Sequence, residues 1–358
     1  MKDFIIHSIV NMYSTLHEYT SFQKKEKKEH YQDIIAPHYF PPLYSYQSPA
    51  FSIQTHRFSL DDPIKPFHQE TKSKTYGDQE IAIITITSQP GYRFYTDCCT
   101  IDASSYLKQD TILDAVAMNG VFYQFQIDSV PLGGYKQGEK ETFRPLQPCY
   151  EPFYRAITIS NEGTLEIHSN PFSNTWNDRH QYHSMMACAP LLIDQGEIVM
   201  TDELLSSYTH EGIHVLQCDI SKPYERGMNV ERNGKKIKSC SSNLPGGLFH
   251  ISNTNPRSVL ITDREGNVYF MRVVGRMNGV LGMDLVQVAQ TIKRYIPNAW
   301  MAINLDGGAP SQLLHKTNGT VMSTTNQYSH TGKSTIWIGN LLSYMKVSDS
   351  FSPLSSFS

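Results

Sequence analysis

The chain has 358 residues, of which 39% are hydrophobic and 18% charged, and its formal net charge is −3. This length is sufficient for one large hydrophobic core or two modest ones. The small net charge leaves no polybasic surface that would attract nucleic acid or acidic lipid, so we expect neither as a partner. No apolar run approaches the roughly 20 residues needed to cross a bilayer, so we expect no membrane span.

The first third of the chain differs in composition from the rest. Residues 1–35 are polar and predict one or two helices, whereas residues 36–76 are rich in Pro, Tyr, His and Ser and predict irregular connection. We therefore expect an N-terminal extension over residues 1–76. The first residues are too polar and their apolar stretch is too short for a signal peptide, so we expect a cytoplasmic protein or export by a route that reads no N-terminal signal.

The next part of the sequence predicts short strands separated by turns. Residues 80–87 are β-branched and apolar, and residues 92–96 alternate, so both segments predict strands. Residues 156–167 and 259–271 each predict a hairpin, because two apolar runs flank a turn that contains Gly, Asn or Asp. The expected fold class is therefore α+β, with mixed, mainly antiparallel sheets and few helices.

Residues 284–295 predict the clearest helix. Asp284 is placed to cap its N-terminus, apolar residues recur at spacings of three and four, and Pro297 ends it. We expect the strands and this helix to form one domain over residues 77–345. The Ser-rich residues 346–358 predict a flexible tail.

The cysteines and histidines predict no metal centre. The six cysteines follow neither a compact disulfide framework nor a zinc spacing, so we expect mostly free thiols. We interpret His180 and His183 as part of an exposed polar loop rather than a metal pair. Cys188 lies among apolar residues, which predicts a buried structural thiol rather than a nucleophile. We expect no cofactor.

The segment 302–311 carries the strongest functional signal. A short apolar run ends in Asn304, Asp306, Gly307 and Gly308, which is typical of a buried strand that enters a turn. Because glycine has no side chain, a ligand can approach the backbone closely there. A carboxylate beside uncovered N–H groups suits an anion or a polarised oxygen. The alternative interpretation is a tight turn in which the aspartate makes a local hydrogen bond.

Five segments, in order along the chain, resemble the phosphodiester glycosidase family, which includes the enzyme that uncovers mannose 6-phosphate by removing N-acetylglucosamine. The family patterns are approximately N-G-G-F-F, G-P-x-L-[IV]-x-x-G, N-x-R-[ST], D-G-R-x-x-G-x-x-G-[ML]-[TS]-L and N-L-D-G-G-G-S. The matching segments are Met118–Tyr123, Ala189–Gly196, Asn255–Ser258, Gly275–Leu285 and Ala302–Ser311. The resemblance implies the fold of that family over about residues 115–337.

Three of the motifs depart from the family pattern. Val274 stands where the family has the aspartate before Gly-Arg, and Val121 stands where it has the second glycine of N-G-G. Ala309 and Pro310 interrupt the D-G-G-G-S run, and a proline has no backbone N–H to hold a phosphate oxygen. These departures favour, as an alternative, a catalytically silent relative that binds a phosphosugar or a protein partner.

Cleavage of a glycosidic bond to phosphate requires a held phosphate, a group for proton transfer and a carboxylate near the developing positive charge. Within the resemblance, Arg257 and Arg276 are the candidates for holding phosphate, because a guanidinium binds it through two parallel hydrogen bonds. Asp306 is the candidate acid–base or charge-stabilising carboxylate. The expected substrate-binding residues are Asn119, Gly120, Asn304, Gly307, Gly308 and Ser311.

The leading functional hypothesis is a hydrolase that cleaves a sugar-1-phosphodiester and releases the sugar and a phosphomonoester. The substrate would be a small molecule or a protein-linked sugar phosphodiester. A second alternative is a phosphodiesterase that acts on a nucleotide-sugar or phosphoribosyl linkage, because the same arginines would serve it. The sequence predicts neither the sugar nor the oligomeric state.

Overall fold

The structure is a computed structural model that describes residues 45–59, 78–122, 133–143, 153–201, 229–232, 235–238, 255–275, 280, 282–308, 311–325 and 337–351. Within these residues every strand pairing is antiparallel. The expected α+β class, with mainly antiparallel sheets and few helices, is therefore confirmed. None of the helices in this part of the chain has the length and hydrophobicity needed to cross a membrane.

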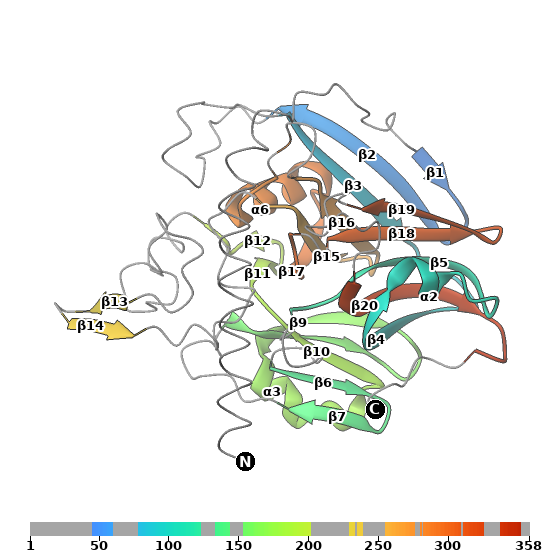
Figure 1. Ribbon diagram of the computed structural model, residues 1–358, viewed down its shortest axis with the longest axis horizontal. Coiled ribbons are helices and arrows are strands. Elements are labelled where there is room, and N and C mark those ends of the chain that lie inside the picture. The colour runs from blue at the N-terminus through green and yellow to red at the C-terminus, as the bar shows by residue number, and fades with distance from the viewer. Residues whose placement is uncertain are drawn as a thin grey trace, which may run out of the picture. The chain divides into compact units, whose positions relative to one another are not determined.

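The largest sheet has eight strands, and two further sheets have five each (Figure 1). The order in the eight-stranded sheet is β1 (Ser45–Gln47), β2 (Phe51–Ser59), β3 (Asp78–Ile86), β16 (Val268–Val273), β15 (Arg257–Asp263), β17 (Ala299–Asn304), β11 (Leu191–Asp194) and β12 (Glu197–Ile198). The first five-stranded sheet has the order β19 (Thr320–Thr325), β18 (Gln312–Thr317), β5 (Ile112–Asn119), β20 (Trp337–Val347) and β4 (Tyr92–Asp102). The second has the order β7 (Lys140–Phe143), β6 (Gly134–Gln137), β10 (Ser184–Cys188), β8 (Arg155–Ile159) and β9 (Leu165–Pro171). Strands β13 (Asn229–Arg232) and β14 (Lys235–Lys238) form a separate two-stranded sheet.

The main core joins the three large sheets. It includes Ile84 of β3, Val116 of β5, Ile157 of β8 and Leu260 of β15, all buried. Strand β3 is buried on both faces, because Ile81 and Ile83 on its other face pack into a second core. This two-sided burial explains why its sequence is an almost continuous apolar run.

Three α-helices occur among the described residues, and each covers one sheet. Helix α6 (Leu285–Tyr295) packs its buried face on the eight-stranded sheet, beside β17 and β11 (Figure 1). Helix α2 (Ala103–Leu107) covers β5 and β20, and α3 (Phe172–Asn177) covers β8 and β10. A 3₁₀ turn, Arg179–Gln181, follows α3.

The predicted helix is confirmed. Asp284 is its N-cap: Gln287 N–H donates to the Asp284 carboxylate at 2.9 Å, and the Gln287 side chain accepts from Asp284 N–H at 3.1 Å. These reciprocal bonds form a capping box, which satisfies two donors at the helix start. The predicted strands at 80–87 and 92–96 and both predicted hairpins are also present.

Residues 45–59 correct the expectation of irregular structure over residues 36–76. They form β1 and β2, and β2 pairs with β3 along its whole length. Phe51 and Ile53 of β2 are buried in the main core. The predicted flexible tail is also wrong for residues 346–351. Lys346 belongs to β20 and pairs with Tyr92 of β4, and the Phe351 ring contacts the Tyr95 ring at a centroid distance of 5.4 Å. We therefore propose that the domain starts near residue 43, where one compact unit of the chain begins, rather than at 77.

Candidate active site

The candidate site is built around Asp306, immediately after β17. The main chain continues the sheet for one residue beyond the strand, because Leu305 N–H donates to Ser258 O at 2.8 Å. Asp306 N–H then turns to the other sheet and donates to Gly120 O at 3.0 Å. Asp306 is thus held between the start of β15 and the end of β5.

Asn119, the last residue of β5, braces this junction. Its amide Nδ2 donates to the Asp306 carbonyl at 2.6 Å. Its Oδ1 accepts from Ser258 Oγ at 2.7 Å and from Gln312 N–H at 2.9 Å. The side chain is buried and three of its hydrogen bonds are internal. Asn119, an expected substrate-binding residue, therefore helps to position Asp306.

Ser311 has a similar bracing position. Its hydroxyl lies 3.0 Å from Ser258 Oγ and donates to Arg257 O at 3.2 Å. The side chain is fully buried. In the structure, the hydroxyl of this expected substrate-binding residue joins the residue before β18 to β15.

Two glycines are required by close packing at the site. A Cβ on Gly120 would overlap the side-chain oxygen of Asn340, and a Cβ on Gly307 would lie 2.7 Å from Pro256 O. Contacts that short do not occur for real side chains, so a larger residue at either position would force its neighbour to move. Gly307 and Gly308 are half-buried and keep contact with solvent beside Asp306. The N–H groups of this turn already have partners: Gly308 N–H donates to Pro256 O at 2.9 Å, and the N–H of Gly307 interacts with the Asp306 carboxyl. The uncovered N–H groups expected from the sequence are therefore not found at these two glycines.

Arg257 lies next to Gly307. Its Cδ is 3.7 Å from the position that a Cβ on Gly307 would take, and its Nε donates to Met283 O at 3.0 Å. The side chain is 3% exposed, so the main-chain contact fixes its direction. Of the two predicted phosphate-binding arginines, the structure brings Arg257 to the glycine turn. Arg276 lies outside the described residues.

The Asp306 carboxyl has an unusual ionisation. The residue is half-buried, and its carboxyl group is its more enclosed part. Burial raises the pKa of Asp306 to about 7, while the N–H of Gly307 acts in the opposite direction. Desolvation has this effect because it disfavours the charged carboxylate. A carboxyl group that is half-ionised near neutral pH can both accept and donate a proton.

Cys188 lies close enough to Asp306 for the two to interact electrostatically. Its thiol donates to Asn304 O at 2.9 Å. Burial raises the pKa of Cys188, and the negative charge of Asp306 adds to the effect. The group is therefore a neutral thiol, and the predicted buried structural cysteine is confirmed.

Asn304 is a buried polar residue of the site, two positions before Asp306. Among the described residues, neither its Oδ1 nor its Nδ2 has a hydrogen-bond partner. Its own N–H donates to Pro190 O at 3.0 Å, so the main chain is fixed. Leaving a buried amide unpaired costs about 1–3 kcal/mol. Such a cost is unusual in native cores and is consistent with a functional role.

The sequence patterns did not indicate Arg272. It lies on β16 directly opposite Ser258 and is 2% exposed. Burial lowers its pKa to about 10, and the carboxylate of Glu80 opposes this shift. The available signal was a charged residue within the apolar strand V-Y-F-M-R-V, because a buried arginine there requires polar surroundings. Because Arg272 pairs with Ser258, it lies at the same end of β15 as the hydrogen bonds that Ser258 makes with Asn119 and Ser311.

The described residues contain no group of three His, Cys, Asp or Glu side chains arranged as a metal site. The fold is similar to that of the zebrafish N-acetylglucosamine-1-phosphodiester alpha-N-acetylglucosaminidase catalytic domain, auto-inhibited by its pro-peptide. The TM-score is 0.51 at 17% identity, and the match covers 86% of this chain and 85% of that one. A hypothetical protein from Synechocystis is similar at a TM-score of 0.47 and 14% identity, over 86% of this chain and 64% of that one. A putative exported protein from Burkholderia pseudomallei follows at 0.42 and 12%, over 75% and 74%.

The sequence itself identifies the family. The sequence model of the phosphodiester glycosidase family matches residues 114–342, which is more than half of the chain. The protein therefore belongs to the phosphodiester glycosidase family, as the resemblance implied. None of the curated protein sequences matches the chain.

Proposed function

We propose that the protein is a hydrolase that cleaves the glycosidic bond of a sugar-1-phosphodiester, with Asp306 as its acid–base residue. The observation that carries this proposal is the enclosed Asp306 carboxyl, whose pKa is raised to about 7 by burial, beside the open turn at Gly307. Family membership supports the reaction class. The substrate named for the zebrafish relative supports a sugar joined to phosphate through its anomeric carbon.

The leaving group reduces the demands on the protein. A phosphomonoester leaves as an anion whose second pKa is about 6, so it needs less protonation than a sugar alcohol does. In the proposed reaction, Asp306 takes a proton from the attacking water or stabilises the oxocarbenium-like transition state. Arg257, beside Gly307, would stabilise the departing phosphate charge. One carboxylate and one guanidinium then supply the main requirements of the chemistry.

The position of the cleaved bond distinguishes this reaction from the alternative phosphodiesterase. The full-length protein would be incubated in ¹⁸O-labelled water with a panel of N-acetylglucosamine-1-phosphodiesters and nucleotide sugars. Glycosidic cleavage places the label in the released sugar, whereas phosphoryl cleavage places it in the phosphate. Label in the phosphate would contradict the proposed glycosidase function and would support the alternative phosphodiesterase.

The variant Asp306→Asn tests the proposed residue in the same assay. Loss of a general acid or base is expected to lower kcat by about 10²- to 10⁴-fold. Asp110→Asn is the matched control, because Asp110 is exposed on a turn before β5. Activity of Asp306→Asn close to that of wild type would remove Asp306 from the mechanism.

A silent binding protein is the second candidate, and one observation favours it. Val274, at the position of the family's aspartate, is buried, and its N–H donates to Glu80 O at 2.9 Å. Substrates that bind without any turnover, in the wild-type protein and in Val274→Asp alike, would establish binding alone as the function. Turnover in Val274→Asp but not in the wild-type protein would show that valine, in place of the family's aspartate, abolishes the enzymatic activity.

A further inference from the structure

A cavity of about 250 Å³ lies away from Asp306, between β4, the β8–β9 turn and the segment before β10. This volume is enough for a small organic molecule. Its position along β20 shows that it is separate from the candidate active site. Arg93, at the cavity, pairs with Met345, whereas Asn119 pairs with Leu341 four residues away. At about 3.3 Å per residue, this corresponds to roughly 13 Å along the sheet.

Arg93 supplies the positive charge of this cavity. Its side-chain stem packs against Gly163 so closely that a Cβ on Gly163 would lie 2.7 Å from Arg93 Cβ. Gly163 has a φ of 85°, and its carbonyl accepts from Phe94 N–H at 3.2 Å. The glycine turn therefore fixes where the guanidinium stem runs. Arg93 itself is exposed and lines the cavity, so its donors can reach a ligand.

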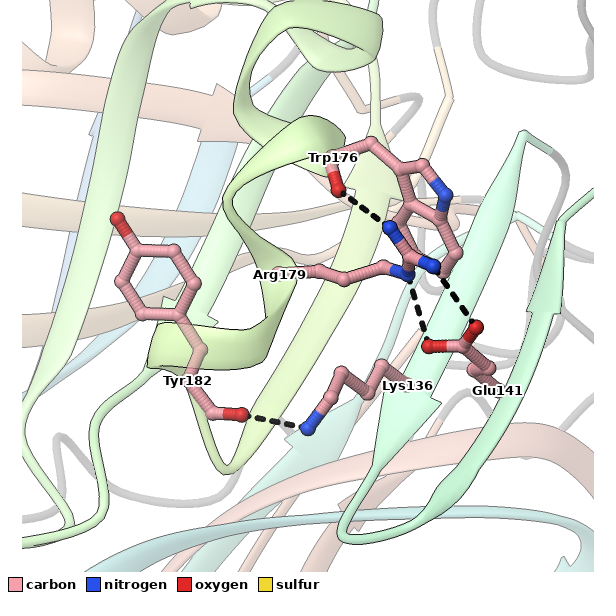
Figure 2. Close-up of polar contacts among 5 residues, drawn as sticks. All are labelled: Lys136, Glu141, Trp176, Arg179 and Tyr182. Atoms are coloured by element: carbon pink, nitrogen blue, oxygen red, sulfur yellow. Dashed lines mark hydrogen bonds and ion pairs between the residues drawn. The ribbon is translucent and has the colours of Figure 1, made fainter.

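His183 lines the same cavity and is held in place by its neighbours. Its carbonyl accepts from Gly138 N–H at 2.8 Å, and the carbonyl of Tyr182 accepts from Lys136 Nζ at 2.6 Å. Figure 2 shows Lys136 reaching the Tyr182 carbonyl from the neighbouring β6 strand. The backbone on both sides of the imidazole is thus fixed before any ligand binds, which lowers the entropy cost of binding.

The 3₁₀ turn before His183 is anchored by a second contact. Arg179 makes two hydrogen bonds to the Glu141 carboxylate, at 2.8 and 3.0 Å, and its guanidinium lies 5.2 Å from the centre of the Trp176 ring (Figure 2). This exposed pair contributes little stability by itself. Its geometric effect is to tie the turn to β7 and so to help hold His183 at the cavity.

The remaining walls combine polar and aromatic groups. Ser160 and Asn161 of the β8–β9 turn line one side, and the edge-to-face pair Tyr95–Phe351 lines another. The charged groups that act on the imidazole are Lys136 on β6 and Arg93 on β4; together with burial they lower the pKa of His183. Glu162, on the turn, interacts with Arg93, but its carboxylate is exposed and already accepts hydrogen bonds from Ser160 and its own backbone N–H.

We propose that this cavity is a second binding site, which takes the anionic group of a small sugar acid or sugar phosphate. The guanidinium of Arg93 would pair with the oxyanion, and the imidazole of His183 would donate a further hydrogen bond to it. The sugar ring would pack against Tyr95 and Phe351. An anion placed between Arg93 and His183 also favours the protonated imidazole. Binding is therefore coupled to uptake of a proton.

The test uses the imidazole signals of His183 in ¹H–¹³C spectra of the full-length protein, assigned by their loss in His183→Asn. Glucose 6-phosphate is expected to shift these signals, and glucose at the same concentration to leave them unchanged. Arg93→Gln is expected to weaken the binding of glucose 6-phosphate about tenfold or more. Arg57→Gln is the matched control, because Arg57 is exposed on β2. Folding of each variant is checked by thermal unfolding.

Glucuronate tests the coupling to protons, because its own charge is constant between pH 6 and pH 8. It is expected to bind more tightly at pH 6. Binding that Asp306→Asn retains and Arg93→Gln loses would locate the ligand in this cavity, whether or not the protein is a hydrolase. No shift of the His183 signals, or an equal shift in Arg93→Gln, would overturn the proposal.

Discussion

The amide of Asn119 donates a 2.6 Å hydrogen bond to the carbonyl of Asp306, a residue 187 positions later in the chain. Because Asp306 N–H donates to Gly120 O at 3.0 Å, the two strand ends are joined by hydrogen bonds in both directions. The position of the candidate catalytic carboxyl is therefore set by β5 as much as by its own strand. This relationship makes the brace testable apart from the chemistry.

Asn119→Ala removes this brace. It leaves Gln312 N–H and the Asp306 carbonyl without Asn119 as a partner, so the free energy of unfolding is expected to fall by about 1–3 kcal/mol. If Asp306 is catalytic, kcat should fall as well, because small displacements of a catalytic group reduce rates strongly. Urea unfolding and steady-state kinetics measure the two effects. Asn177→Ala, at an exposed position that ends α3, is the control and should change neither.

Asp306→Asn should alter stability in a pH-dependent way. The folded pKa of about 7 lies above the unfolded value of about 3.9, so between these values the folded state keeps a proton that the unfolded chain has released. Wild-type stability should therefore fall as the pH rises from 4 to 7, and asparagine lacks this term. The variant should be more stable than wild type at pH 8 by about 1–3 kcal/mol. This range is smaller than the full pKa shift would give, because Asp306 is partly exposed and solvent screens its charge. The difference should shrink towards pH 4. Denaturant unfolding at pH 4, 6 and 8 would show it, and parallel curves for the two proteins would contradict it.

Gly120→Ala should destabilise the protein through one neighbour. The added methyl group would overlap the Asn340 side chain, whose amide accepts from Val121 N–H at 2.6 Å and donates to Val121 O at 2.9 Å. Overpacking of this kind costs about 1–3 kcal/mol. In an Asn340→Ala background the overlap is gone, so the same glycine substitution should cost less. A double-mutant cycle that shows additive effects would rule out this contact as the cause.

Deletion to residue 77 tests the revised start of the domain. A chain that begins at Gly77 lacks β1 and β2, which exposes the edge of β3 and removes Phe51 from the core. Loss of a buried phenylalanine side chain alone costs about 3–5 kcal/mol. This chain is expected to aggregate or to melt without cooperativity, whereas one that begins at Leu43 should retain a cooperative transition. Similar melting of both chains would show that β2 contributes little.

Local patterns predicted the parts of the fold in which adjacent residues determine the structure. The helix at 285–295 followed from Asp284, the apolar spacing and Pro297, and the hairpins followed from their turn residues. Strand β2 was missed because its alternation is short and lies among Pro, Tyr and His residues. Its partner, β3, begins only at Asp78, so the pairing that stabilises β2 is not encoded by adjacent residues.

The candidate site shows the same division. The turn after β17 identified Asp306, Gly307 and Gly308, because a strand end and paired glycines are visible in sequence. The internal roles of Asn119 and Ser311 were not visible, since they depend on partners on other strands. The raised pKa of Asp306 likewise arises from enclosure by distant segments, which no sequence pattern measures.

Strand β20 lies between β5 and β4, although it is the last strand among the described residues. Its Asn340 holds the residues that follow β5, and its opposite edge pairs with β4 over most of its length. While the protein is being synthesised, β4 and β5 therefore leave the ribosome long before the strand that separates them. The junction of Asn119 with Asp306 can reach its final support only after residue 347 has emerged. A ribosome stalled before this point would carry a chain in which the candidate active site is incomplete, so the emergence of β20 sets the earliest moment at which this junction can take its final structure.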